Sequence, residues 1–146
     1  MATKFYKCAH CGNVIVKTVD SGVPVVCCGQ KMEELVPNTI DASQEKHVPV
    51  VTALEGGKLR IEVGSVLHPM STEHHIAFIY VEAENGGILV NLKDEPVAEV
   101  CPGGARPIAV YEYCNLHGLW KKDIDIESCP KKQKGSYTSP FYPCGT

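Results

Sequence analysis

Four histidines and one cysteine in the later part of the chain are residue types that bind transition metals. Cys114 and His117 occur together as Cys114-Asn-Leu-His117, downstream of His47, His68 and His74. Imidazole suits iron, zinc, copper and nickel, and a thiolate adds a soft, electron-rich ligand. Each residue lies beside a turn signal, so the side chains can converge at strand ends. A mixed set of this size favours redox chemistry over a purely structural metal site.

Four cysteines near the start form a second group. Cys8 and Cys11 make a Cys-x2-Cys knuckle, which lets two sulfurs face one ion, while Cys27 and Cys28 are adjacent. Neighbouring side chains in an extended chain point to opposite faces, so the adjacent pair requires a special backbone, which Gly29 can relieve. The pattern predicts a distorted tetrahedron of sulfurs that suits iron and zinc equally, and a disulfide is the less favoured alternative.

The elements that position these groups are predicted to be short strands. Period-2 alternation is visible in residues 58–63, and no stretch has a sustained helical period. Gly56-Gly57 and Asn85-Gly86-Gly87 are hairpin turn signals. The spacing of about seven strands in the later part predicts a mainly β fold with an antiparallel β-sandwich. Strands are predicted over residues 4–7, 13–19, 48–54, 58–67, 75–83, 88–92, 97–100, 108–113 and 119–124.

The chain is predicted to have four parts. Residues 1–36 form a cysteine-rich unit that is too small to bury enough apolar surface alone, so a metal is expected to stabilise it. Residues 37–46 are polar and are predicted to be a linker. Residues 47–126 carry the sandwich, and residues 127–146 are predicted to be an irregular tail that contains two more cysteines.

Bulk composition excludes several classes of protein. The chain has 146 residues, eight cysteines and a net charge of −3. This charge gives no electrostatic case for binding nucleic acid. No apolar run approaches the roughly 20 residues that span a bilayer. The first residues lack the apolar core of a secretion signal, so a cytoplasmic location is expected, where many cysteines indicate metal ligands before disulfides.

Several blocks of the sequence occur in one order and together resemble a known family. After the cysteine unit come Glu45-Lys46-His47-Val-Pro, Gly64-Ser-Val-Leu-His68-Pro-Met, then His74, then Glu112-Tyr-Cys114-Asn-Leu-His117-Gly-Leu-Trp120. These blocks resemble the superoxide reductases. With the four-cysteine unit in front, the chain resembles the two-iron form, the desulfoferrodoxins. The resemblance covers roughly residues 5 to 122.

This resemblance implies a fold and two metal sites. The fold would be a small desulforedoxin-like, rubredoxin-type metal unit followed by an immunoglobulin-like antiparallel β-sandwich. Each chain would hold two non-haem iron ions and no haem, flavin or nucleotide. The first iron would be bound by four thiolates: Cys8, Cys11, Cys27 and Cys28. The catalytic iron would be bound by four equatorial imidazoles and one axial thiolate: His47, His68, His74, His117 and Cys114.

The implied activity is the one-electron reduction of superoxide to hydrogen peroxide without dioxygen formation. Electrons would come from a rubredoxin-type donor. Lys46 matches a mobile lysine near the open face of the iron, and Glu45 matches a glutamate that binds the iron after oxidation. Both would be catalytic residues. The resemblance further implies a homodimer, with no nucleic-acid or membrane partner.

Two other functions fit parts of the pattern. One is an iron- or copper-containing electron-transfer protein without superoxide chemistry. Blue-copper sites use two histidines, one cysteine and a weak axial methionine, but here no methionine follows Met70. The other is a zinc-stabilised binding module, in which structural zinc takes four ligands rather than five.

Some residues depart from the family pattern. His75 follows His74 where the family commonly has an aromatic residue. The six-residue step from His68 makes His74 the ligand and His75 a residue of the rim. Cys101 is predicted to be a thiol at a strand end. Free thiols, a disulfide and an extra metal clip all stay open for the remaining two cysteines, Cys129 and Cys144.

Overall fold

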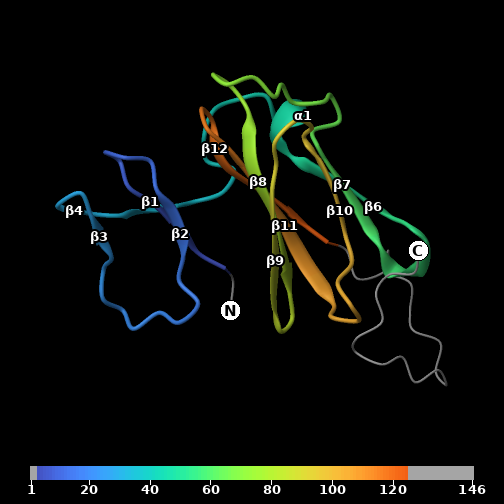
Figure 1. The fold of residues 1–146 in the computed structure, drawn as a ribbon, viewed down its shortest axis with the longest axis horizontal. Helices are drawn as coiled ribbons and strands as arrows, with labels where there is room; N and C mark the ends of the chain where they lie inside the picture. The colour runs from blue at the N-terminus through green and yellow to red at the C-terminus, as the bar shows by residue number, and fades with distance from the viewer. Residues whose placement is uncertain (1–2, 125–146) are drawn as a thin grey trace. The chain divides into compact units, whose positions relative to one another are not determined.

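The structure is a computed structural model that describes residues 3–124. The chain divides into two compact units, residues 1–39 and residues 40–146 (Figure 1). The predicted tail, residues 127–146, lies outside the described residues, and so do its two cysteines, Cys129 and Cys144.

The first unit is built from very short strands. β1 (Phe5–Lys7) lies between β2 (Val14–Val16) and β5 (Glu33–Leu35) in an antiparallel sheet. β3 (Val26–Cys27) and β4 (Gln30–Lys31) form a separate hairpin. β1 and β2 lie within two of the predicted strands. The other three strands were not predicted, because two or three residues are too few to show an alternating pattern.

A tight turn joins β3 to β4 and carries the adjacent cysteines. Cys27 pairs with Gln30, so Cys28 and Gly29 are the two residues of the hairpin loop. Their φ angles are +53° and +73°, which is the combination of a type I′ turn. A positive φ is uncommon for a residue other than glycine. The predicted special backbone at the cysteine pair is therefore confirmed, and the turn lets the two sulfurs lie on one side.

The second unit is an antiparallel β-sandwich, as predicted. Within residues 40–124, a three-stranded sheet has the order β10-β7-β6 and a four-stranded sheet has the order β12-β11-β8-β9 (Figure 1). Both predicted hairpins occur, β6–β7 and β8–β9. The seven strands are β6 (Pro49–Ala53), β7 (Leu59–Val63), β8 (Ile76–Ala83), β9 (Gly86–Asn91), β10 (Val97–Val100), β11 (Pro107–Cys114) and β12 (Gly118–Asp123).

The core of this unit follows from the alternation of its strands. In β7 the buried residues are Leu59, Ile61 and Val63, and the charged residues Arg60 and Glu62 between them face out. Burial of such side chains contributes roughly 1.5–3 kcal/mol each. The buried cluster draws on both sheets: Leu59, Ile61, Val63, Ile76, Ile79, Val81, Ala98, Val100, Val110 and Cys114.

Two short helical turns accompany the strands. α1 (Gln44–His47) overlaps the end of the segment predicted to be a linker, residues 37–46. It ends where Val48 precedes a proline, a position that disfavours the helical backbone. The other, η1 (Glu55–Gly57), is part of the β6–β7 connection. Within residues 3–124, neither helix has the length and apolar character needed to cross a membrane.

The end of β7 shows why the prediction of a strand over residues 58–67 was too long. Gly64 has a φ of +82°, and a Cβ there would lie 2.6 Å from the carbonyl oxygens of Glu45 and Val66. The chain turns at this glycine and packs directly against the backbone of α1. The N–H of Val66 donates to the Glu45 carbonyl (3.1 Å), and the N–H of Gly64 donates to the Val48 carbonyl (3.2 Å). These contacts hold α1 beside the loop that follows β7.

Candidate metal centres

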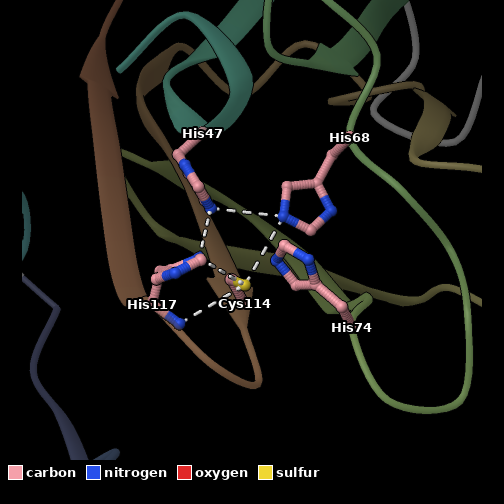
Figure 2. A group of neighbouring side chains, drawn as sticks. All are labelled: His47, His68, His74, Cys114 and His117. Atoms are coloured by element: carbon pink, nitrogen blue, oxygen red, sulfur yellow. Dashed lines mark hydrogen bonds between the residues drawn. The ribbon is translucent and has the colours of Figure 1, made fainter. Parts of the chain in front are cut away.

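Connections at one end of the sandwich bring five metal-binding side chains into one group (Figure 2). Their ligand atoms all lie within 4.8 Å of one another. Within each sheet the register brings two connections together, because Pro49 pairs with Val63 and Ile76 with Cys114. The distances between the ligand atoms place these connections at the same end of the sandwich. The five residues come from α1, the β7–β8 connection, the end of β11 and the turn after it: His47, His68, His74, Cys114 and His117.

The tautomers of two imidazoles can be assigned from their partners. His47 Nδ1 lies 2.7 Å from the Ser43 carbonyl, and His68 Nδ1 lies 2.7 Å from the Pro69 carbonyl. A carbonyl only accepts, so each Nδ1 carries the hydrogen and each Nε2 has a free lone pair. The two Nε2 atoms are 3.2 Å apart. Two lone pairs at this distance repel unless a cation lies between them.

The other two imidazoles complete the same picture. His117 Nδ1 lies 3.0 Å from His47 Nε2 and 3.8 Å from Cys114 Sγ. His74 Nε2 is buried and has no hydrogen-bond partner within the described residues. Buried polar atoms normally have a hydrogen-bond partner, so this nitrogen needs a partner that the protein atoms do not supply, such as a metal ion. The donor set of four imidazoles and one sulfur therefore fits a transition-metal ion.

The sulfur of Cys114 is enclosed at the centre of the group. Its residue is fully buried, and Sγ lies 3.5 Å from His68 Nε2. The backbone N–H of His117 donates to this sulfur (3.4 Å). Burial raises the pKa of the Cys114 thiol, so an arriving metal ion has to displace its proton.

Burial also sets the charge of the imidazoles. It lowers the pKa of His47 and of His74, and it lowers the pKa of His68 to about 4. These three rings are therefore neutral at physiological pH. The neutral imidazole is the form that binds metals.

Trp120 supports the group in a way that the sequence did not reveal. Its ring stacks on His47, with centroids 5.0 Å apart and planes inclined by 21°. Its Nε1–H donates to the His117 carbonyl (3.1 Å). The sequence identified Trp120 only as the last residue of the block that begins with Glu112. Its close spacing to His117 was the available signal, but the contact with His47 depends on the fold.

Glu112 is a second residue whose position was not predicted. It lies two residues before Cys114 on the same face of β11, fully buried. Within residues 3–124 neither of its carboxyl oxygens has a hydrogen-bond partner, and burial raises its pKa to about 9. The carboxyl is thus neutral at physiological pH. A charged residue type at an inward position of an apolar strand was the signal that could have identified it.

Glu45 and Lys46 lie in α1 immediately before His47 and are exposed. The Glu45 carboxylate accepts a hydrogen bond from the Ser43 hydroxyl (3.3 Å). The positive charge of Lys46 helps to lower the pKa of both His47 and His74, so its field reaches the group. Neither side chain belongs to the group of five in this structure.

The four cysteines of the first unit form the other group, with all sulfurs within 4.8 Å of one another. The Sγ of Cys11 lies 3.6 Å from that of Cys27, which lies 4.0 Å from that of Cys28. All four are free thiols, so the disulfide alternative is not what the structure has. Cys8 is buried, whereas Cys11 and Cys28 are exposed. Four sulfurs at these distances suit a tetrahedral iron or zinc ion.

The sulfurs of this group make different hydrogen bonds, and the pKa values of Cys8 and Cys28 shift in opposite directions. The backbone N–H of Cys11 donates to Cys8 Sγ (3.5 Å), and this bond is the main reason why the pKa of Cys8 falls to about 6. The contact with the Cys11 side chain raises the pKa of Cys28 to about 12. The amide Nδ2 of Asn13 donates to Cys27 Sγ (3.6 Å).

Two further residues can be compared with their predictions. His75 lies outside the group of five, and its Nδ1 lies 3.0 Å from the Ser71 carbonyl. Cys101 was predicted to be a thiol, and this prediction is wrong, because Cys101 is disulfide-bonded. A local pattern of Cys followed by Pro and two Gly carries no information about a bonding partner elsewhere in the chain.

Comparisons with known proteins agree with both groups. The family model for desulfoferrodoxin matches residues 39–123, and the model for the desulfoferrodoxin N-terminal domain matches residues 2–35. The desulfoferrodoxin of Nitratidesulfovibrio vulgaris is 41% identical over 122 residues, which cover 82% of this chain and 95% of that protein. A desulfoferrodoxin homolog of Archaeoglobus fulgidus is 44% identical over 119 residues, which cover 80% of this chain and 93% of that protein.

A solved structure supports the same relationship. The crystal structure of the superoxide reductase from Treponema pallidum is similar with a TM-score of 0.70 and 29% sequence identity, covering 84% of this chain and 100% of that one. With both family models matched, the chain belongs to the desulfoferrodoxin family. The resemblance read from the sequence blocks is thereby confirmed.

Proposed function

We propose that this protein is a superoxide reductase. It reduces superoxide by one electron, and with two protons the product is hydrogen peroxide, without dioxygen formation. The observation that carries the proposal is the group of five ligand atoms within 4.8 Å, in which two imidazole lone pairs face each other beside a buried sulfur. Superoxide reductase is also what the similar protein of Treponema pallidum is called.

The proposed ligands of the catalytic iron are His47, His68, His74, His117 and Cys114. Iron held there would supply a one-electron reductant whose electron density is raised by the thiolate. The protein provides preorganisation, because the Ser43 and Pro69 carbonyls orient the rings of His47 and His68, and Trp120 stacks on the His47 ring. Such outer partners fix the tautomer and the ring orientation of a metal-binding histidine.

Lys46 and Glu45 are the proposed catalytic residues beside the iron. Lys46 is exposed and its positive charge acts on His74 and His47, so it attracts a small anion toward the group. The same ammonium stabilises the negative charge that develops on the reduced substrate. Glu45, its exposed neighbour of opposite charge, is proposed to provide a carboxylate to the metal after turnover.

The first unit is proposed to hold a second iron through Cys8, Cys11, Cys27 and Cys28. A rubredoxin-type protein is the proposed electron donor, since the reaction consumes one electron per superoxide. The working form is proposed to be a cytoplasmic homodimer. Sedimentation of the purified protein tests the dimer, and reduction by added rubredoxin tests the donor.

Metal analysis joined to rapid kinetics tests the main proposal. The purified protein should contain two irons per chain and show a thiolate-to-ferric absorption band. Pulse radiolysis of the reduced protein should show its oxidation by superoxide with hydrogen peroxide as product. Zinc or copper in the second group, or dioxygen formation, would contradict the proposal.

The copper alternative has less support than iron. Met70 is not among the five side chains of the group, and its sulfur accepts a hydrogen bond from the N–H of Ile76 (3.4 Å). A blue-copper site needs two histidines and a weak methionine ligand, whereas four imidazoles converge here.

A further inference from the structure

We propose that Asn115 is a positioning residue that holds His74 in the second metal centre. The inference rests on the proposed function, since it concerns how the proposed iron ligands are arranged. It goes beyond that function because Asn115 offers no ligand atom to the group of five. Its side chain acts on the loop that carries His74, from the turn that carries Cys114 and His117.

The carboxamide of Asn115 bonds to both peptide groups that flank His74. Its Oδ1 accepts from the backbone N–H of His75 (2.8 Å), and its Nδ2 donates to the carbonyl of Glu73 (2.9 Å). The Glu73 carbonyl belongs to the peptide before His74, and the His75 N–H belongs to the peptide after it. One amide therefore restrains both backbone torsions of His74, and through them the direction of its Cα–Cβ bond.

A third bond joins the same two segments through the backbone. The N–H of Asn115 donates to the His75 carbonyl (3.2 Å). This bond does not depend on the side chain and survives substitution at position 115. Changing the carboxamide therefore tests its own contribution while the attachment of the two segments is retained.

His74 needs this restraint more than the other three histidines do. The Nδ1 atoms of His47 and His68 lie against backbone carbonyls, and the carbonyl of His117 is held by Trp120. For the His74 ring no bond of this kind is found within residues 3–124, and its buried Nε2 is the atom left for the metal. The contacts of its own loop are local turns, in which Ser71 bonds to the backbone of His74. The Asn115 carboxamide adds a side-chain tie between this turn and the Cys114 side of the centre, next to the backbone bond from the Asn115 N–H.

The consequence is that His74 is preorganised as a metal ligand. A ligand whose backbone is already fixed loses less conformational entropy when the metal binds. Partners of this outer kind typically change metal affinity by about 10- to 100-fold. Asn115→Ala should therefore weaken metal binding at the second centre by about 10-fold or more and shift its spectrum, while the first centre is unaffected.

The test is a cobalt titration of the full-length apo-protein, followed by visible absorption. Cobalt is expected to bind at both centres, and the sulfur-only first centre should have its own bands, so it serves as an internal control in every sample. Asn115→Ala is compared with the wild type and with Asn91→Ala, a change on exposed β9. We expect weaker cobalt binding and an altered absorption spectrum at the second centre in Asn115→Ala but not in Asn91→Ala. Wild-type affinity and spectrum at this centre in that variant would overturn the inference.

A double-mutant cycle with His74→Ala separates positioning from a general loss of stability. If Asn115 acts through His74, then Asn115→Ala has no additional effect on cobalt affinity once His74 is removed. Additive losses would show that Asn115 acts by another route and would overturn the inference. Asn115→Asp keeps the acceptor for His75 but places a carboxylate oxygen against the Glu73 carbonyl oxygen, so it should also weaken cobalt binding at the second centre. It serves if the alanine variant does not fold.

The proposed function fails by a different result. A wild-type protein that binds no cobalt at the second centre, or that does not reduce superoxide when loaded with iron, refutes the function itself. A wild type that does both, with an Asn115→Ala variant identical to it, refutes only the role of Asn115.

Discussion

The two metal-binding groups are assembled in opposite ways. The first takes its four sulfurs from two short stretches, Cys8 to Cys11 and the Cys27-Cys28 turn, and two of its residues are exposed. The second joins side chains as far apart in the chain as His47 and His117, and its His47, His68 and Cys114 are buried. A group assembled locally can form wherever the chain bends correctly, whereas a group assembled from distant segments requires the complete sandwich.

The packing around the two groups differs accordingly. In the first unit the buried apolar residues within the described chain are Phe5, Cys8 and Met32, so one of its few core side chains is itself a candidate ligand. The second unit has a continuous apolar cluster from both sheets behind its group. We infer that the metal stabilises the fold in the first unit, while the fold prepares the metal site in the second.

Removal of both metals is the strongest test of this contrast. Stripping the full-length protein with a chelator should unfold residues 1–39, because a unit of this size is rarely stable without a metal or disulfide. Residues 40–124 should keep their strands. Amide hydrogen exchange, read separately for the two units, provides the measurement. Equal protection of both units from hydrogen exchange in the apo-protein would show that the two units do not differ in their dependence on metal.

Cys114→Ser should abolish both the thiolate-to-ferric absorption band and the reduction of superoxide. A hydroxyl is a poor substitute for a thiolate as a soft, electron-donating ligand. Absorption spectra and pulse radiolysis of the iron-loaded variant provide the measurement. Circular dichroism should be unchanged, because the substitution replaces one sulfur by an oxygen and leaves the other nine residues of the buried cluster in place. Retained turnover would show that the sulfur is not the ligand the reaction depends on.

Cys28→Ser should remove the first iron and leave superoxide reduction at the second centre within about twofold of the wild type. The catalytic iron can be reduced directly in the assay, so the first centre is not needed for the chemical step. Iron analysis should fall from two to one per chain. If both metals are lost, then the first unit is required for folding of the second, and the two regions are not independent.

Lys46→Ala should slow the capture of superoxide several-fold and reduce its dependence on salt. The lysine charge acts over a short range that is screened within about 10 Å at 0.1 M salt. Rates measured by pulse radiolysis at several ionic strengths test this. Lys58→Ala is the matched control, since it removes the same charge at the far end of β7, where Lys58 pairs with Glu99 (2.8 Å). Identical rates for both variants would make Lys46 a bystander.

Asn13→Ala should change only the first centre, and by the smallest amount. Loss of the N–H···S bond to Cys27 (3.6 Å) removes stabilisation of the reduced, more negative state. A hydrogen bond worth about 1 kcal/mol corresponds to a fall of roughly 40 mV in a one-electron potential. Spectroelectrochemistry measures both irons in one sample. The potential of the second iron is the control, and an unchanged first potential would rule out the bond as a tuning contact.

Local patterns predicted the parts of the fold that depend on neighbours in sequence. The Cys28-Gly29 turn was anticipated from the adjacent cysteines, and the β6–β7 and β8–β9 hairpins were anticipated from their glycines. The predicted strand over residues 58–67 was too long, because Gly64 turns the chain where it meets the backbone of α1. Contacts between distant segments leave no mark on local alternation.

The sequence by itself determined which atoms are available for metal chemistry and how the strands alternate. It also carried the order of blocks by which the family is recognised. The family blocks predicted His74 rather than His75 as the ligand, but the tertiary structure alone decided how the atoms are held: Trp120 stacks on His47, and the Asn115 carboxamide clamps the loop of His74. The physical reason is that residue type follows from the sequence at each position, whereas convergence requires the register of two packed sheets.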